Sequence, residues 1–150
     1  MGRRFRIVKV DLEHAGRREQ LAAMHDECFP EFEQVEPWGD WWFVFEAGGD
    51  KPVGFAGLWR SQRAEGAGYL ARAGVLPKAR GRGLQKRLIQ VREREARRKR
   101  WTVLFSDTYP GNPHSLNNLF ACGFRAFTPT EPWCGGDWIY LKKIITEGVG

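Results

Sequence analysis

Two glycines, Gly81 and Gly83, stand between an apolar segment that ends at Leu76-Pro77 and a long segment with helical periodicity that begins near Leu84. A strand, a tight glycine loop and a helix in that order predict a β-loop-α unit, which is typical of α/β folds. Glycine lacks a Cβ atom, so the loop backbone can turn tightly and expose successive N–H groups. Those groups, together with the positive end of the helix dipole, predict an anion site.

Basic side chains surround this loop, namely Lys78, Arg80, Arg82 and Lys86. Because the donors are spread along the loop, a pyrophosphate fits the pattern better than a single phosphate does. The segment matches neither the P-loop motif nor the dinucleotide-binding motif. Gly-Arg repeats also occur in RNA-binding tails, but those tails are disordered, whereas this segment joins two amphipathic elements.

The rest of the chain alternates short apolar strands with helices. Strands are expected at residues 4–10, 41–47, 53–60, 69–76, 101–106, 124–128 and 138–145. Helices are expected at residues 12–28, with Asp11 as the N-cap, and at residues 84–100 and 112–122. The 150 residues, of which 42% are hydrophobic, contain no linker or repeat, so we expect a single domain that spans residues 1–150.

Net charge and cysteine content limit the kinds of binding partner and the cellular compartment that we expect for this chain. The net charge of +6 suits an anionic partner such as nucleic acid, an acidic membrane or a phosphorylated small molecule. Cys28, Cys122 and Cys134 are widely spaced, which indicates reduced thiols in a cytoplasmic protein and no metal site. No apolar run approaches the roughly twenty residues of a membrane span, and the basic residues 1–6 lack the apolar core of a signal peptide.

Two motifs resemble those of a known family. Arg80-Gly81-Arg82-Gly83 resembles the Q/R-x-x-G-x-G/A signature of the GNAT superfamily of acetyl-CoA-dependent N-acetyltransferases, and the preceding residues 73–77 resemble the strand end that leads into it. Asn112-x-x-Ser115 followed by Gly123-Phe124 is similar to the family's second motif, N-x-x-S/A…G-F. The motifs occur in the correct order with a strand between them, and the element order of nearly the whole chain is similar to that of the family.

The resemblance implies a fold and a cofactor. The expected fold is α/β, with a GNAT-like mixed, mostly antiparallel central sheet of six to seven strands flanked by helices and a V-shaped opening between the fourth and fifth strands. Acetyl-CoA would lie in that opening as the co-substrate, without a metal, and a backbone N–H near Gly74 would polarise the thioester carbonyl. By motif position, the cofactor-binding residues are Ala73, Gly74, Val75, Arg80, Gly81, Arg82, Gly83, Leu84, Gln85, Asn112 and Ser115.

Some of these residues also have plain structural interpretations. Asn112 and Ser115 are common at helix N-termini, where they cap, and Gly74 is as compatible with a weakened strand end as with a bulge. The chain also departs from the family pattern: Gln85 stands where the signature ends in Gly or Ala, and Leu119 stands where a Tyr is frequent. The frequent Glu on the strand before the loop has no counterpart in residues 69–72.

Candidates for the proton chemistry are therefore few. Asp107 and Tyr109 follow the predicted strand at residues 101–106, near the mouth of the expected opening, and Tyr109 is the predicted catalytic acid. A tyrosine in a surface loop that only packs is the alternative interpretation. The acceptor is expected beside the acidic residues Glu31, Glu33, Glu36 and Asp40, with Trp38, Trp41 and Trp133 as walls.

The resulting functional hypothesis is an N-acetyltransferase that moves the acetyl group of acetyl-CoA to a primary amine by direct attack in a ternary complex. The acceptor is a small molecule or a peptide, no membrane is involved, and the protein is a monomer or homodimer. The alternative is a non-catalytic module of the same fold that binds acetyl-CoA or nucleic acid. For nucleic acid, the binding element would be the helix at residues 84–100, which carries eight basic residues.

Overall fold

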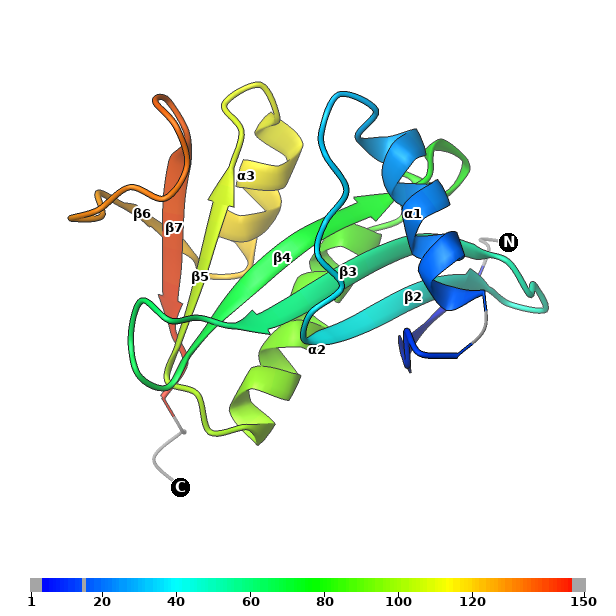
Figure 1. Cartoon of the computed structure of the whole chain (residues 1–150), viewed down its shortest axis with the longest axis horizontal. Helices are drawn as coiled ribbons and strands as arrows, with labels where there is room; N and C mark the ends of the chain where they lie inside the picture. Colours follow the sequence, from blue (N-terminus) through cyan, green and yellow to red (C-terminus); the bar gives the residue numbers. More distant parts are fainter. Residues whose placement is uncertain (1–3, 15, 147–150) are drawn as a thin grey trace. The chain divides into compact units, whose positions relative to one another are not determined.

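Seven strands pair into one mixed sheet in the order β1-β2-β3-β4-β5-β7-β6 (Figure 1). The computed structural model describes residues 4–14 and 16–146, so part of the basic segment 1–6 lies outside it. The strands are β1 (Phe5–Val10), β2 (Asp40–Glu46), β3 (Pro52–Arg60), β4 (Ala67–Val75), β5 (Val103–Thr108), β6 (Arg125–Phe127) and β7 (Ile139–Ile144). The helices are α1 (Arg17–Cys28), the short 3-10 helix η1 (Pro77–Ala79), α2 (Leu84–Arg98) and α3 (Pro113–Ala121).

Strand pairing confirms the predicted fold class. The β4–β5 pair is parallel, whereas β1–β2, β2–β3, β5–β7 and β6–β7 are antiparallel. The parallel ladder joins residues 67–69 to residues 103–105, although β4 continues to Val75 and β5 to Thr108. The V-shaped opening between the fourth and fifth strands stays a prediction.

Two compact units share the sheet. Among the described residues, the first consists of those up to 59 together with residues 71–88, and the second of residues 60–70 together with residues 89–146. In the first unit, α1 lies on the face of β2 and β3 that carries Phe43 and Phe55 (Figure 1). The Trp41 ring covers Gly57, where a Cβ atom would lie 2.7 Å from the indole. Trp41 is therefore a core residue rather than the predicted wall of an acceptor site, since only 1% of it is exposed.

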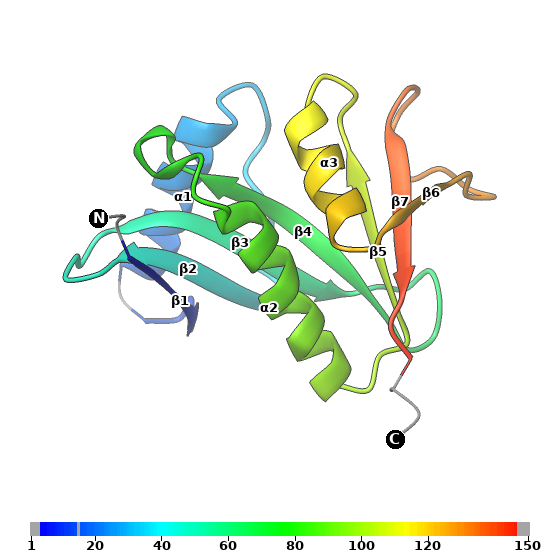
Figure 2. The ribbon, with the colours of Figure 1, turned by 180° about the vertical axis from the view of Figure 1, so that it is seen from behind.

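In the second unit, α3 lies against β5 (Figure 2). Residues of β5 alternate in burial, so Leu104, Ser106 and Thr108 are buried while Phe105 and Asp107 on the other face are half-buried. The alternation follows from the two-residue repeat of a strand. Asp107 thus belongs to β5, which continues to Thr108, two residues beyond the predicted end of that strand.

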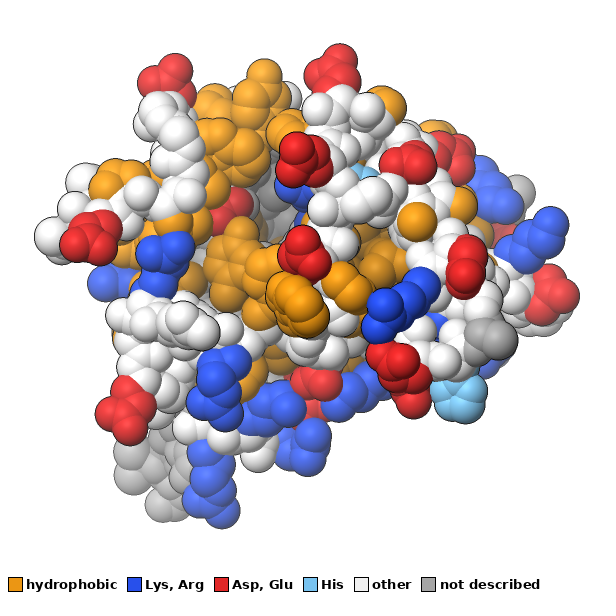
Figure 3. All heavy atoms as spheres, viewed as in Figure 1, with side chains coloured by type: hydrophobic (Ala, Val, Ile, Leu, Met, Phe, Trp, Pro, Cys, Tyr) orange, Lys and Arg blue, Asp and Glu red, His pale blue; other side chains and the backbone are white. Residues whose placement is uncertain are grey.

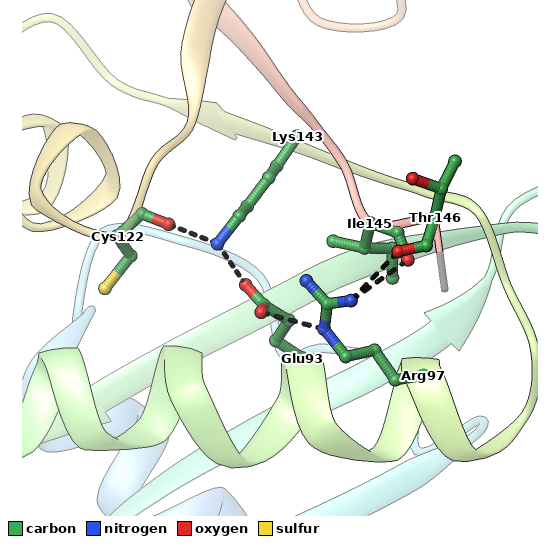
Figure 4. Close-up of polar contacts among 6 residues, drawn as sticks. All are labelled: Glu93, Arg97, Cys122, Lys143, Ile145 and Thr146. Carbon is green, nitrogen blue, oxygen red and sulfur yellow. Dashed lines mark hydrogen bonds and ion pairs between the residues drawn. The ribbon is translucent and has the colours of Figure 1, made fainter. Parts of the chain in front are cut away.

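A cluster of charges ties α2 to β7 in this unit (Figure 4). Glu93 accepts a hydrogen bond from Arg97 at 3.1 Å, one helical turn away, and the two side chains form an i,i+4 ion pair. Lys143 on β7 donates to Glu93 and to the Cys122 carbonyl, and Arg97 also donates to the carbonyl of Ile145 at 3.3 Å. Part of the basic surplus on α2 therefore holds the fold together.

The start of the first helix differs from the prediction. α1 begins at Arg17, after Gly16 in the left-handed region (φ 84°). Asp11 does not cap it, because its Oδ1 accepts a hydrogen bond from the Glu13 N–H at 2.9 Å and closes a local turn. Asp side chains commonly compete with helix capping in this way.

No helix in the part of the chain that the structure describes is long and apolar enough to cross a membrane.

Candidate active site

The glycine loop connects β4 to α2 through η1. Gly81 and Gly83 both have positive φ, 77° and 73°. A Cβ atom at either position would meet nothing within 4 Å. Glycine is therefore required here by the left-handed backbone and not by crowding. This loop, residues 80–85, is called the phosphate loop below.

Backbone donors are available along the phosphate loop. Within the described residues, the N–H groups of Gly81, Arg82 and Gly83 donate to no protein acceptor. The N–H groups of Leu84 and Gln85 belong to the first turn of α2, where no intrahelical acceptor exists. Successive free donors at a helix N-terminus form an anion site with chemistry that fits a pyrophosphate.

The arginines of the loop are not equivalent. The Nε of Arg80 donates to the Val75 carbonyl at 2.9 Å, so this side chain turns back toward the end of β4. Arg82 and Lys78 are exposed. We therefore assign the structural part of the loop's charge to Arg80 and leave Arg82 and Lys78 as the side chains available to a phosphate.

The end of β4 places Ala73, Gly74 and Val75 in the same unit as the phosphate loop. A Cβ atom at Gly74 would lie 2.9 Å from the Phe55 ring and 3.0 Å from the Cys28 sulfur. Close packing accounts for this glycine, a reason that neither sequence interpretation contained. β4 is followed directly by Leu76, whose N–H donates to the Val53 carbonyl at 2.8 Å.

The second motif lies at the start of α3, in the other unit. Asn112 is the N-cap, and its Oδ1 accepts a hydrogen bond from the Ser115 N–H at 3.1 Å. The capping interpretation of Asn112 is confirmed, and contact of either residue with the cofactor stays a prediction. Leu119, at the position of the family's frequent Tyr, is buried within α3.

Tyr109 lies in the loop that follows β5. Its side chain is 52% exposed, and its ring centroid lies 5.9 Å from that of Trp138. The phenol is accessible to a reactant, while the ring has a packing partner. Its role as the catalytic acid stays a prediction.

Asp107 lies on the half-buried face of β5, in a cluster of polar side chains that the sequence did not predict. Asp107 Oδ2 accepts hydrogen bonds from the Tyr69 hydroxyl at 2.6 Å and from Trp133 Nε1 at 2.8 Å. The three side chains come from β4, β5 and the segment between β6 and β7, and all belong to the second unit. Two donors on one oxygen fix the direction of the carboxylate.

Aromatic packing holds the Trp133 end of this cluster. Arg63 lies over the Trp133 ring at 4.2 Å, and the Tyr140 ring meets it edge-on at 4.6 Å. The Tyr140 hydroxyl accepts from the Cys134 N–H at 2.9 Å and donates to the Cys134 carbonyl at 2.7 Å. The segment before β7 is thereby fixed to the sheet.

Two thiols of the chain are held in the protonated form. Burial, with Asp107 beside it, raises the pKa of the Cys134 thiol to about 12. Burial also raises the pKa of the Cys28 thiol, although Arg80 partly opposes the change. Because the thiolate is the nucleophile, neither cysteine is suited to attack a thioester. Within the described residues, no group of three or more His, Cys, Asp or Glu could hold a metal ion.

The structure thus separates the predicted residues into two groups. The end of β4 and the phosphate loop lie in the first unit, and Tyr109, Asn112 and Ser115 lie in the second. The sequence signal for Asp107 was the alternation of β5, which puts it on the same face as Phe105. Trp133 was predicted only as a wall of the acceptor site, and Tyr69 gave no signal in the sequence.

Known proteins resemble the chain in sequence pattern and in fold. Residues 10–124 match the model of the acetyltransferase (GNAT) family. No curated protein matches the chain in sequence. Among solved structures, the ribosomal-protein-S18-alanine N-acetyltransferase from Escherichia coli superposes with a TM-score of 0.74 at 13% identity, covering 95% of either chain.

Two further similar structures contain the cofactor. An acetyltransferase from Bacillus subtilis in complex with CoA gives a TM-score of 0.73 at 15% identity, covering 95% of this chain and 99% of that one. A Salmonella typhimurium protein solved with its cofactor acetyl-CoA gives a TM-score of 0.70 at 17% identity. The match covers 97% of this chain and 96% of that one. At such identities the likeness concerns the fold.

Proposed function

Because the chain belongs to the GNAT family of acetyltransferases, we propose that it transfers the acetyl group of acetyl-CoA to a primary amine by direct attack in a ternary complex. The proposal for the acetyl donor rests on the row of backbone N–H groups at Gly81, Arg82 and Gly83, which have no acceptor among the residues that the structure describes. The same fold binds CoA or acetyl-CoA in two of the similar structures. The 150 residues would act as one acetyltransferase domain.

Donor binding follows from the chemistry of the phosphate loop. The N–H groups of the loop and the first turn of α2 would hold the pyrophosphate, with Arg82 and Lys78 adding charge. The backbone at Ala73–Val75 would pair with the pantetheine arm, and an N–H there would donate to the thioester oxygen. Such a donor, aimed at developing negative charge, is typically worth about 3 kcal/mol of transition-state stabilisation.

The transfer step makes one bond and breaks one. The nitrogen lone pair of the neutral amine attacks the thioester carbonyl carbon, the C–N bond forms, and the C–S bond breaks with its electron pair on sulfur. The attacking nitrogen loses a proton, for which the oriented carboxylate of Asp107 is the base that we propose. Tyr109 would protonate the departing CoA thiolate.

Direct attack is favoured over an acetyl-cysteine intermediate at Cys28 or Cys134. Such an intermediate needs a thiolate, and the pKa values of Cys28 and Cys134 are both raised. Free thiols also fit the cytoplasmic location that we propose, since none of the cysteines forms a disulfide.

The acceptor is proposed to be a primary amine on a small molecule or a peptide. A lysine-type ammonium titrates near about 10.4 and an α-ammonium near about 8 in water, so at neutral pH the acceptor arrives as a cation. The ammonium releases one proton to solvent to give the neutral amine that attacks. The acetyltransferase from Escherichia coli that shares the fold acts on a ribosomal-protein alanine, which makes peptide N-termini a first class to test.

An amine panel with acetyl-CoA tests the proposal. Free CoA is quantified by chromatography after the protein is mixed with acetyl-CoA and, in turn, N-terminal peptides, lysine peptides, polyamines and aminoglycosides. CoA release that depends on one amine class supports the enzyme. Tight acetyl-CoA binding by calorimetry, with no release for any amine, would instead support the binding module.

A further inference from the structure

Arg72 of β4 connects that strand to the segment that follows α1. Its Nη1 donates to the Glu33 carbonyl at 2.9 Å and lies 2.6 Å from the Nε2 of His25. The rings of Phe29 and Phe32 lie 5.3 and 5.1 Å from its guanidinium carbon. Four contacts of one guanidinium thus join β4 to the last turn of α1 and to the chain beyond it, all within the first unit.

This arrangement defines the state of His25. A guanidinium can only donate, so Nε2 of His25 must accept, and the ring is neutral with its proton on Nδ1. The ring is fully buried, and its Nδ1 has no partner among the described residues. Burial and the Arg72 charge lower the pKa of His25, with Asp26 opposing, which agrees with the neutral form.

The segment held by Arg72, residues 29–39, differs in character from the basic remainder of the chain. Glu31, Glu33 and Glu36 are exposed, and Trp38 is 62% exposed. Figure 3 shows acidic side chains gathered over the segment between α1 and β2. An exposed indole beside three carboxylates is suited to a cationic ligand.

Two more hydrogen bonds fix the segment. The Gln34 Nε2 donates to the Ala22 carbonyl at 3.2 Å on α1, and the Trp38 carbonyl accepts from Trp41 Nε1 at 2.7 Å. Arg72 is the anchor that reaches the segment from β4, on the stretch where the family frequently has a carboxylate. An arginine cannot accept a proton from an amine, so a role of a different kind must account for it.

We propose that Arg72 is a positioning residue for the amine acceptor: it holds residues 29–39 in place so that their carboxylates and Trp38 receive a cationic acceptor. The inference rests on the proposed function. In this proposal the acceptor amine binds at residues 29–39, and neutral His25 helps to hold Arg72 in place.

Arg72→Met tests the role, because methionine keeps the aliphatic packing against the rings but removes the hydrogen bonds to Glu33 and His25. With the acceptor found in the amine panel, KM for that acceptor should rise about tenfold or more, while the Kd for acetyl-CoA stays within about twofold. Hydrogen exchange should quicken in peptides covering residues 29–39 and remain unchanged in α3 and β5. Arg6→Met is the matched control, since Arg6 also stacks on a ring of the first unit, Phe45.

Variants at His25 keep the test decisive if Arg72→Met folds poorly. His25→Gln retains an acceptor for Arg72 and should leave the acceptor KM close to that of wild type. His25→Leu removes the acceptor and should raise the KM in the same direction as Arg72→Met. An unchanged acceptor KM and unchanged exchange in both Arg72→Met and His25→Leu would overturn the inference. Absence of turnover by wild type with every amine would instead contradict the proposed function and, with it, the acceptor role.

Discussion

The phosphate loop presents backbone N–H groups from one short run of residues, whereas the Asp107 carboxylate on β5 is held by side chains from two distant parts of the chain. In the loop, Gly81 and Gly83 set the backbone and the helix start supplies the field. At Asp107, a hydroxyl from β4 and an indole from the segment before β7 meet on one oxygen.

The difference suggests a division of labour. A backbone site recognises a group that never changes, the pyrophosphate of CoA, and tolerates many side-chain substitutions around it. A side-chain site can be altered one residue at a time, which suits an acceptor that differs among members of a family. Substitutions at Asp107 should therefore change turnover, and substitutions at the loop should change donor affinity.

The largest expected effect is for Asp107→Asn. The amide preserves size and can still accept from Tyr69 and Trp133, but it cannot take a proton. Loss of a positioned base commonly costs about 10²–10⁴-fold, so kcat should fall on the order of 10³-fold in steady-state assays. Asp137→Asn, at an exposed carboxylate in the segment between β6 and β7, is the control and should be active. Wild-type kcat in Asp107→Asn would remove Asp107 from the mechanism.

Tyr109→Phe should lower kcat by about 10²-fold, the usual contribution of a positioned acid. The ring and its packing on Trp138 remain, so the Kd for acetyl-CoA should be almost unchanged in a calorimetric titration. Tyr69→Phe is the comparison, because it removes a donor to Asp107 and not an acid. Equal kcat in Tyr109→Phe and wild type at every pH would leave water, or no acid, as the better account.

Arg82→Ala should weaken CoA binding about tenfold, the effect of losing a solvent-screened contact worth about 1.5 kcal/mol. Acetyl-pantetheine, which lacks the pyrophosphate, should bind the variant as it binds wild type. Lys51→Ala removes an exposed charge of the β2–β3 turn and serves as the control. Equal losses for CoA and acetyl-pantetheine would mean that Arg82 does not contact the pyrophosphate. Arg80→Ala is a poorer probe because Arg80 also binds the Val75 carbonyl.

A smaller effect is expected from the acidic segment. Electrostatic attraction of a cationic acceptor weakens with salt, so the acceptor KM of wild type should rise with ionic strength. Glu33→Gln with Glu36→Gln should raise the KM a few-fold at low salt and flatten the salt dependence. An unchanged salt dependence in this double variant would show that the acceptor approaches elsewhere.

The smallest expected effect concerns stability. The pKa of His25 is lowered in the folded protein, so the unfolded chain binds a proton at higher pH than the native one does. The free energy of unfolding should therefore hold above about pH 6.5 and fall as the pH drops below it. His25→Gln should reduce that acid loss in urea titrations, and His14→Gln, at an exposed histidine, should not. Parallel pH profiles for His25→Gln and wild type would contradict the assignment.

Element order and the phosphate loop could be predicted because both are properties of contiguous residues. The strand-loop-helix signal, the glycine spacing and the apolar periods all lie within short windows. The Asp107 cluster could not be predicted, because its members Tyr69, Asp107 and Trp133 are far apart in the sequence. The end of β5 was also predicted two residues early. The register of a strand decides which face of the sheet each side chain lies on. With the strand end misplaced, the sequence did not show which face Asp107 lies on or which side chains contact it.

The direction in which long side chains point also could not be predicted from the sequence. From the sequence, Arg80 and Arg72 could be identified only as positive charges. In the structure Arg80 binds the end of β4, whereas Arg72 binds His25 and the segment after α1. Several low-energy rotamers exist for an arginine, and only the packed neighbours select among them.

Mass balance with isotopically labelled acetyl-CoA tests the central claim most directly. The protein is incubated with acetyl-CoA labelled in the acetyl group, first alone and then with the acceptor amine, and both protein and small products are analysed by mass spectrometry. The account predicts no label on any cysteine in the absence of amine, and one N-acetylated acceptor for each CoA released in its presence. Label on a cysteine that passes to the amine, or bound acetyl-CoA that never yields a product, would contradict direct transfer.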